Sequence, residues 1–243
     1  MRIVKPLLLF VFLLTAGNLS ALDFKEANKL YEAGKYSEAV TAYNSLKDGG
    51  NNSAELLFNL GNAYFKDKRT GYALLCYERA HKIAPRDADI KYNLDFARSF
   101  IKENAVEDPA SRFVSRFYYF LTLNELCALL TSVFIVLLAL LFLRLSRKDE
   151  LTYWLTFSFS LLFLLLFVFS AVRIYEQENT RSAIIVSPSV EARAAPLESN
   201  PASFTLPEGK KVLLLNFRND WVEILLRTEN IKGWIKKDAL AEI

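Results

Sequence analysis

Two long apolar runs constrain the fold of this chain more than any other feature of its sequence. Residues 126–143 and 151–172 contain no charged side chain, and the runs are 18 and 22 residues long. A helix needs roughly 17–25 apolar residues to cross the hydrocarbon core of a bilayer. Two adjacent buried core helices are the alternative, but the length of the runs, their richness in Leu and Phe and the lack of a polar face argue against it. The runs therefore predict two transmembrane helices.

The short linker between the runs, residues 144–150, forces the two helices into a hairpin. The linker holds three basic residues, which favours the cytoplasmic side under the positive-inside rule. The soluble segments on both sides of the hairpin would then lie outside the cytoplasm. Three basic residues at the outer ends of the hairpin, Arg112, Arg116 and Arg173, count against this orientation.

The N-terminal segment, residues 1–21, has the pattern of a secretory signal peptide. Arg2 and Lys5 precede an apolar stretch that ends in small residues. Cleavage could follow Ala16 or Ala21, and an uncleaved membrane anchor is the alternative. Either outcome exports the segment that follows, in agreement with the orientation deduced from the hairpin linker.

The segment between the signal and the first apolar run repeats every 34 residues. Identical or similar residues recur at this spacing, including Ala39 with Ala73, Tyr43 with Tyr77 and Asn59 with Asn93. A 34-residue period with small residues at fixed offsets is typical of paired helices that cross closely. Pro85 would end the second pair.

This pattern resembles the tetratricopeptide repeat, through Leu60-Gly61, Ala63-Tyr64, Ala73, Tyr77, Ala80 and Pro85. The resemblance implies a repeat domain over residues 22–103, with two full repeats and the first helix of a third as a cap. It also implies that the groove formed by the first helices binds a protein partner. The groove-facing residues would be Asn28, Tyr31, Asn59, Asn62, Phe65, Lys66, Asn93 and Phe96.

Two of these asparagines, Asn28 and Asn59, match positions of repeats that clamp a C-terminal carboxylate. The basic residues of that clamp are missing, since Phe24 and Asp89 stand at two of their places. The sequence therefore does not support capture of a C-terminal carboxylate. An alternative is that the asparagines only hydrogen-bond to neighbouring backbone.

After residue 172 the sequence changes to short alternating runs separated by turn residues. The pattern predicts strands at 183–186, 190–193, 211–216, 221–226 and 233–235, which together suit a small all-β barrel.

The order of motifs over 182–243 resembles bacterial SH3-like domains, through residues 206–212, 220–224 and 233–235. The two tryptophans, Trp221 and Trp234, could close the barrel. Alternatively, they could line a groove for a peptide or a cell-wall glycopeptide together with Phe217.

The sequence offers no catalytic set, cofactor motif or metal site. It holds one histidine and two cysteines, and it lacks phosphate-binding loops, nucleophile elbows and zinc motifs. His81 is expected on a solvated surface, and Glu78 is expected on an exposed helix face beside Lys82. Glu125 fits a helix cap with Thr122, and an intramembrane acid is the alternative. The net charge of +3 gives no overall attraction for nucleic acid.

The expected architecture is a multidomain membrane protein of α-helical repeat hairpins, two transmembrane helices and a small all-β SH3-like barrel, with a linker and interfacial segment at 104–125. This order resembles the tetratricopeptide-repeat membrane proteins of the Bat aerotolerance operons. The resemblance implies a non-enzymatic scaffold in the bacterial inner membrane, with both soluble domains in the periplasm. It also implies partnership with von Willebrand A-domain membrane proteins and a MoxR-type ATPase. The alternatives are a sensor that binds peptidoglycan through the SH3-like domain and a periplasmic assembly chaperone.

Overall fold

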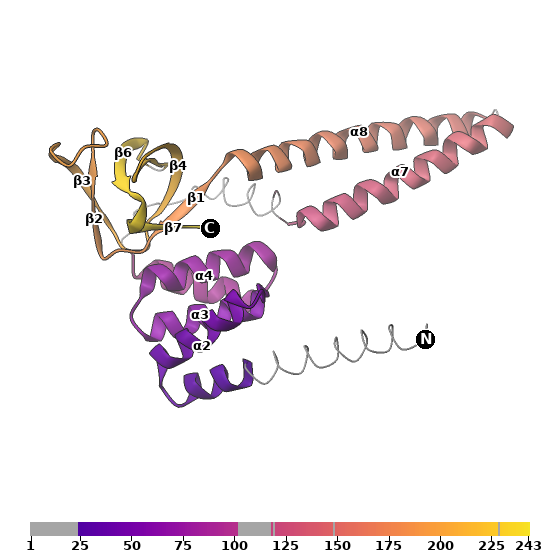
Figure 1. Cartoon of the computed structure of the whole chain (residues 1–243). Coiled ribbons are helices and arrows are strands. Elements are labelled where there is room, and N and C mark those ends of the chain that lie inside the picture. Colours follow the sequence, from indigo (N-terminus) through magenta and orange to yellow (C-terminus); the bar gives the residue numbers. More distant parts are fainter. Residues whose placement is uncertain (1–23, 102–117, 119, 148, 228) are drawn as a thin grey trace, which may run out of the picture. The chain divides into compact units, whose positions relative to one another are not determined.

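The computed structural model describes residues 24–101, 118, 120–147, 149–227 and 229–243. Its contacts divide the chain into two compact units, one formed by Met1–Ala105 with Ser182–Ile243 and the other by Val106–Arg181. The helices that precede the apolar runs and the strands that follow them therefore belong to one unit (Figure 1). The expected signal peptide and most of the segment 104–125 lie outside the described residues.

Residues 24–101, called the repeat module below, are helical. A helix covers residues 24–32, and it is followed by α2 (Tyr36–Asp48), α3 (Ala54–Lys66), α4 (Thr70–Ile83) and α5 (Ala88–Ser99). Two N-termini are capped as the sequence favours, because the side chain of Ser53 accepts from the Leu56 N–H and that of Asp87 from the Ile90 N–H. The helical-repeat prediction is confirmed.

Small residues let the helices of the repeat module cross closely. Ala39, Ala63 and Ala73 are fully buried. A Cβ atom on Gly61 would lie only 2.7 Å from the ring of Tyr77, so α3 can approach α4 this closely only with glycine at that position. The repeated small residues are thus contact points between helices.

The apolar runs form α7 (Leu123–Ser146) and α8 (Glu150–Asn179), which pack side by side as a hairpin (Figure 1). Both helices are long and apolar enough to cross a membrane. The helix-cap interpretation of Glu125 is confirmed. Its carboxylate accepts from the Thr122 N–H at 2.9 Å, and its own N–H donates to the Thr122 hydroxyl at 3.3 Å.

The C-terminal end of α8 is hydrogen-bonded to Tyr118, in the segment before α7. The Tyr118 hydroxyl donates to the Glu176 carboxylate at 2.8 Å, and the Arg173 guanidinium donates to the Tyr118 carbonyl. The same guanidinium lies 4.9 Å from the centre of the Tyr118 ring. Arg173, which seemed to oppose the expected orientation, thus has local partners at this end of the hairpin.

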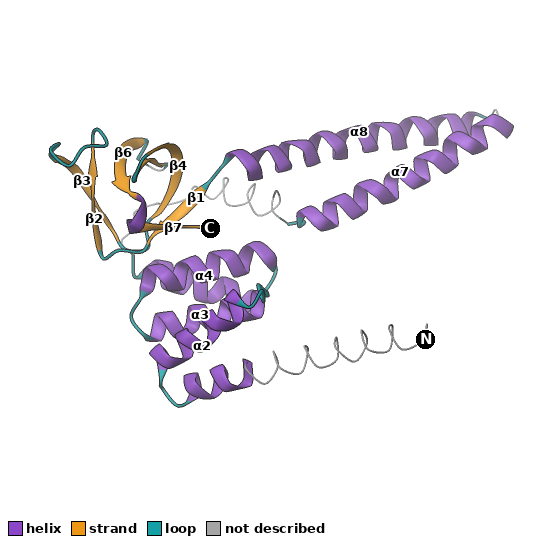
Figure 2. Cartoon of the chain, in the orientation of Figure 1, coloured by secondary structure: helices purple, strands orange, loops and turns teal. Residues whose placement is uncertain are grey.

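Residues 182–243, called the β module below, form one antiparallel sheet in the order β3-β2-β6-β5-β4-β1-β7 (Figure 2). The strands are β1 (Ser182–Ile185), β2 (Ser189–Arg193), β3 (Ala202–Pro207), β4 (Lys211–Arg218), β5 (Trp221–Leu226), β6 (Ile231–Lys236) and β7 (Leu240–Glu242). Buried residues from β1 to β6 meet in one cluster, so the sheet curls around its own core. The sequence predicted five of these strands and missed β3 and β7, the two edge strands.

The two modules share an apolar junction. Ile184 of β1 is buried in the core of the repeat module, and Ala241 and Ile243 pack against the same core. A Cβ on Gly71 of α4 would lie 2.6 Å from the Ile185 carbonyl oxygen, so α4 meets β1 backbone to backbone. The repeat and β modules are therefore docked as one body.

A buried carboxylate, that of Glu78 on α4, forms the polar part of this junction. Glu78 is 8% exposed, and it pairs with Arg98 of α5 at 2.5 Å and with Lys211 of β4 at 2.9 Å. Burial alone would raise the pKa of Glu78, but Lys211 and Arg98 together hold that pKa below its usual value. The expectation of an exposed Glu78 beside Lys82 was wrong, because its partners come from distant elements.

The N-terminus of α4 is capped by a side chain of the β module. No side chain of its own caps this helix. Instead, the carboxylate of Glu208, in the turn between β3 and β4, accepts from the Gly71 N–H at 2.6 Å. A carboxylate at this place also complements the positive end of the helix dipole.

Candidate partner-binding sites

A cavity of about 220 Å³ opens between the first helices of the repeat module. It is lined by Tyr31, Asn62, Phe65, Lys66, Tyr77, Tyr92, Asn93 and Phe96. Six of the eight residues expected in the groove thus come together, while Asn28 and Asn59 lie outside the lining. Sequence reasoning missed Tyr77, which belongs to a second helix, and Tyr92, which the repeat alignment could have identified.

Exposed aromatic rings dominate one wall of this cavity and continue beyond it along α5. Tyr92, Phe96 and Phe100 follow one another at four-residue spacing, and they are 70%, 45% and 62% exposed. Their rings touch in sequence, with centroids 6.3 Å apart for Tyr92 and Phe96 and 5.1 Å apart for Phe96 and Phe100. Phe65 of α3 packs on both phenylalanines. These four rings are called the aromatic stripe below.

The remaining exposed surface of α5 is mostly polar or charged. Asp89, Lys91 and Asp95 are exposed, and the half-buried Arg98 pairs with Asp95 at 3.6 Å. A polar surface is what the last helix of a repeat stack requires. The aromatic stripe therefore stands out as exposed apolar surface on a helix that otherwise meets solvent with charges.

The asparagines on the first helices are tied to tyrosines of the second helices. The Tyr43 hydroxyl donates to Asn28 Oδ1 at 2.5 Å, and 34 residues later the Tyr77 hydroxyl donates to Asn62 Oδ1 at 2.7 Å. Burial raises the pKa of Tyr43 to about 12 and also raises that of Tyr77, so both hydroxyls stay protonated and donate. Of the two asparagines to which the backbone alternative applied, Asn28 thus bonds to a side chain.

A second amide joins this network inside the cavity. The Asn93 side-chain amide donates to Asn62 Oδ1 at 2.8 Å. Asn62 Oδ1 thereby accepts two hydrogen bonds, while the NH₂ group of Asn62 and the Oδ1 atom of Asn93 have no partner among the described residues. The cavity thus presents one unused amide donor group and one unused amide acceptor.

The tryptophans of the β module lie outside its core. Trp221 and Trp234 alternate along β5 and β6 with the fully buried Val222 and Ile235, so they face away from the core cluster. Neither tryptophan belongs to the core cluster, so this orientation does not support the interpretation in which they close the barrel. Phe217 is also exposed, and the Lys237 ammonium lies 5.5 Å from the centre of its ring.

A cavity of about 380 Å³ lies beside Trp221 on the outer surface of the β module. It is lined by Ser187, Ser189, Val190, Glu191, Arg193, Glu198, Trp221, Lys236, Asp238 and Ala239. Trp234 and Phe217 are not part of this lining. Of the three aromatic residues predicted for one ligand groove, Trp221 alone lines this cavity.

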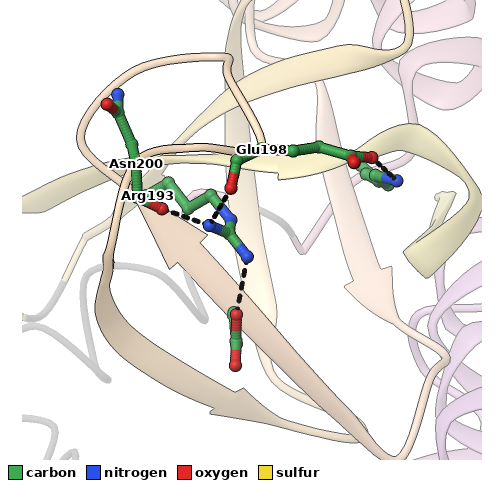
Figure 3. Close-up of polar contacts among 5 residues, drawn as sticks. Arg193, Glu198 and Asn200 are labelled. Atoms are coloured by element: carbon green, nitrogen blue, oxygen red, sulfur yellow. Dashed lines mark hydrogen bonds and ion pairs between the residues drawn. The ribbon is translucent and has the colours of Figure 1, made fainter.

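Arg193 shapes one wall of this second cavity by holding the loop between β2 and β3. Its guanidinium donates to the backbone carbonyls of Glu198 and Asn200 and to the carboxylate of Glu191 (Figure 3). The Glu198 carboxylate in turn accepts from Lys236 of β6. Most charges around the cavity thus neutralise one another, and its walls are held in place.

The described residues do not assemble a catalytic centre from the sequence candidates. His81 is half-buried and not solvated as expected, and its Nδ1 has no hydrogen-bond partner within the described part of the chain. Burial lowers the pKa of His81 and raises that of the Cys76 thiol to about 12, which leaves both neutral near pH 7. No three His, Cys, Asp or Glu side chains that could hold a metal ion gather in the described ranges.

Comparison with known proteins identifies one of these features. Residues 54–87 match the family described as tetratricopeptide repeat, so the chain contains such a repeat. No curated protein matches the chain.

Two solved structures from Trichomonas vaginalis resemble a small part of the chain. NlpC2 is 24% identical with a TM-score of 0.24, over 26% of this chain and 25% of that protein. NlpC1 is 20% identical with the same TM-score, over 26% of this chain and 24% of that protein. The chain thus spans about a quarter of the length of these proteins, and likeness at this level carries no argument about fold or activity.

Proposed function

We propose that this protein is a membrane-anchored scaffold that binds protein partners through the groove of its repeat module. The observation that carries the proposal is the aromatic stripe, which leaves Tyr92, Phe96 and Phe100 exposed beside a cavity of about 220 Å³. Exposed apolar patches on otherwise charged surfaces mark interaction sites. Tetratricopeptide repeats are interaction modules, so the matched family supports the same role.

Both modules belong on one side of the membrane in this proposal. The repeat module precedes α7 and the β module follows α8, yet they share a core through Ile184 and an ion pair through Glu78. Two segments that pack on each other must be separated by an even number of crossings, which two spanning helices provide. The basic linker 144–150 supports a cytoplasmic hairpin turn and hence a periplasmic location for both modules.

This orientation can be tested with single cysteines introduced at exposed positions. In a Cys76→Ala, Cys127→Ala background, a membrane-impermeant maleimide should label Ser45→Cys and Arg218→Cys in spheroplasts, but not Ser146→Cys before lysis. Labelling of only one of the two module positions would rule out the shared side. Labelling of Ser146→Cys alone would place both modules in the cytoplasm.

The physiological setting we propose is an envelope complex of the Bat type, linked to stress or aerotolerance. The proposal rests on the resemblance of the module order: repeats, an apolar hairpin and an SH3-like domain. Partners in such a complex would be von Willebrand A-domain membrane proteins and a MoxR-type ATPase.

A pull-down after chemical crosslinking in native membranes tests the scaffold role. A few discrete membrane proteins should be recovered with the unmodified chain and lost with Tyr92→Ser combined with Phe96→Ser. A matched control with Tyr175→Ser and Ile231→Ser exchanges two exposed apolar residues elsewhere in the chain and should retain them. Equal recovery with both double variants would refute binding through the groove.

A second candidate function is binding of the cell wall by the β module. The cavity of about 380 Å³ beside the half-buried Trp221 favours it, because an aromatic wall with polar groups suits a glycopeptide. Full-length protein in detergent should then co-sediment with purified peptidoglycan, and Trp221→Ala should abolish this. Trp234→Ala, a matched tryptophan outside the cavity lining, should not. Absence of co-sedimentation would eliminate this candidate.

A further inference from the structure

We infer that the groove of the repeat module takes an internal, extended segment of its partner that carries a bulky apolar side chain, and not a chain terminus or a helix. This inference rests on the proposed function, since it names the partner chemistry of the same groove. Four features of the cavity lead to it: an open amide pair, the aromatic stripe, the small number of charges and the rigidity of the amides.

The amide pair supplies one unused donor group and one unused acceptor side by side. Asn93 and Asn62 are joined at 2.8 Å, so the NH₂ group of Asn62 and Oδ1 of Asn93 lie in one cluster of side chains. A peptide unit offers a C=O acceptor and an N–H donor, which complement this pair. A ligand that covers these two groups must hydrogen-bond to both, because a polar group buried without a partner is costly.

The same pair selects the conformation of the ligand. In the middle of a helix every N–H and C=O is already bonded within the helix, so a helical segment could not use the amides. An extended segment keeps its backbone groups free. The open amides of Asn62 and Asn93 therefore favour an extended partner.

The aromatic stripe supplies the apolar contact. Phe65 and Phe96 lie 5.7 Å apart between centroids, and both line the cavity beside Asn93. A bulky aliphatic or aromatic side chain next to the bound peptide unit would cover these rings and remove their surface from water.

The charges of the cavity argue against a chain terminus as the ligand. Lys66 is the single ionisable cation among its lining residues, and no acidic side chain lines it. A carboxylate terminus is normally held by several cationic or N–H donors, and an amino terminus needs acidic groups. The neutral amides instead suit an uncharged peptide unit within a chain.

The amides are also held rigid, which lowers the cost of binding. Asn62 Oδ1 accepts from Tyr77 at 2.7 Å as well as from Asn93, so the orientation of both amides is fixed before a partner arrives. Asn59, which lies one repeat before Asn93, is outside the cavity lining. Asn59 is therefore the natural control for Asn93.

Site-specific photocrosslinking in membranes of the protein's own cells tests this inference on the full-length chain. A benzoyl-phenylalanine in place of Tyr92 should crosslink to a partner, and the crosslinked residue is located by mass spectrometry. We expect it to fall within a partner segment at least ten residues from either terminus, next to a bulky apolar residue. Asn93→Leu should reduce the crosslinking yield about fivefold or more, whereas Asn59→Leu should leave it unchanged.

The outcomes separate the inference from the proposed function. Crosslinks at a partner's terminal residues or on a helical segment, or equal yields with Asn93→Leu and Asn59→Leu, would overturn the inference while leaving partner binding intact. Benzoyl-phenylalanine in place of Ile83, an exposed residue outside the cavity lining, gives the background yield. If position 92 crosslinks no protein above this background, the proposed function itself is overturned.

Discussion

Two faces of the repeat module differ in whether their polar and apolar groups already have partners within the chain. On the face toward the β module, the Glu78 carboxylate is matched by two cations and the Gly71 N–H by the Glu208 carboxylate. In the groove, amide atoms of Asn62 and Asn93 lack partners within the described part, and the aromatic stripe remains exposed.

This contrast shows which face is already occupied. On the face toward the β module the polar groups are paired, and Gly71 leaves room for the backbone of β1. The partner of this face is therefore the β module of the same chain. A surface with open amides and exposed rings is prepared for a partner outside it. Helical repeats can thus use one face for internal docking and the other for recognition, and the following changes test the distinction.

The largest effect is expected from leaving the Glu78 carboxylate buried without a cation. Arg98→Met combined with Lys211→Met should lower the free energy of unfolding by about 3 kcal/mol, because an unpaired buried charge is strongly unfavourable. Denaturant unfolding of the full-length protein in detergent, followed by circular dichroism, measures this. Adding Glu78→Met should recover most of the loss, and Lys82→Met alone should change little. A loss below about 0.5 kcal/mol would mean that the ion pairs do not hold the junction.

Acid should weaken the repeat module in two steps. The pKa of His81 is held below 6.5 chiefly by burial, so the unfolded chain takes up its proton first and stability falls as pH drops below about 6.5. The pKa of Glu78 is held below 4.5 against burial by Lys211 and Arg98, so a second loss begins as pH drops below about 4.5.

Unfolding measured at pH values from 7.5 to 3.5 resolves these steps. His81→Gln should remove the first step, and Glu78→Gln should remove the second. Stability that rises as the pH falls from 6.5 to 5 would contradict the proposed sign for His81.

Because α4 lies so close to β1, we expect Gly71→Ala to destabilise the protein, whereas the same change would stabilise a free helix. In a free helix this change would stabilise by up to about 1 kcal/mol. Here the new Cβ would meet backbone atoms of Ile185 and Val186 at 2.6 and 3.0 Å, so we expect a loss of about 1–3 kcal/mol in thermal or denaturant unfolding. A gain in stability would mean that the two modules can separate at no cost.

Removal of the cap supplied by the β module should have a smaller effect. Glu208→Ala takes an acceptor and a negative charge from the N-terminus of α4, which should lower stability by about 1 kcal/mol. Hydrogen exchange should show faster exchange at the Gly71 amide. Glu208→Gln keeps an acceptor oxygen and should lose less. Unchanged exchange at Gly71 with Glu208→Ala would argue against this cap.

The smallest effect on stability is expected in the groove. Tyr92→Ser combined with Phe96→Ser removes rings that are 70% and 45% exposed, so the free energy of unfolding should change by only about 0.5 kcal/mol per residue. A thermal unfolding curve of the full-length double variant checks this. A loss above about 2 kcal/mol would identify the aromatic stripe as part of the core and remove the contrast between the faces.

The sequence predicted features whose causes are local or periodic. The 34-residue spacing located the paired helices, uncharged length located α7 and α8, and the spacing of Thr122 and Glu125 located a helix cap. Six of the eight residues expected in the groove line one cavity, because their places follow from the repeat itself.

The errors arose where distant elements decide the environment of a residue. Glu78 was predicted to be exposed beside Lys82, because the sequence around Glu78 does not indicate that Arg98 and Lys211 are its partners. The edge strands β3 and β7 are weakly patterned, and Pro207 at the end of β3 suggested only a turn. The outward direction of Trp221 was readable in its alternation with Val222, but family resemblance favoured a place in the barrel.

The cap on α4 has a consequence for the order of events during synthesis. Glu208 lies 137 residues after the Gly71 amide that it caps, and both apolar helices lie between them. A ribosome therefore completes the helix long before it makes the residue that finishes its first turn. Until the residues after α8 have been synthesised, the N-terminus of α4 lacks its cap and Glu78 lacks its Lys211 partner. Closure of the junction therefore requires that every intervening segment has already been made.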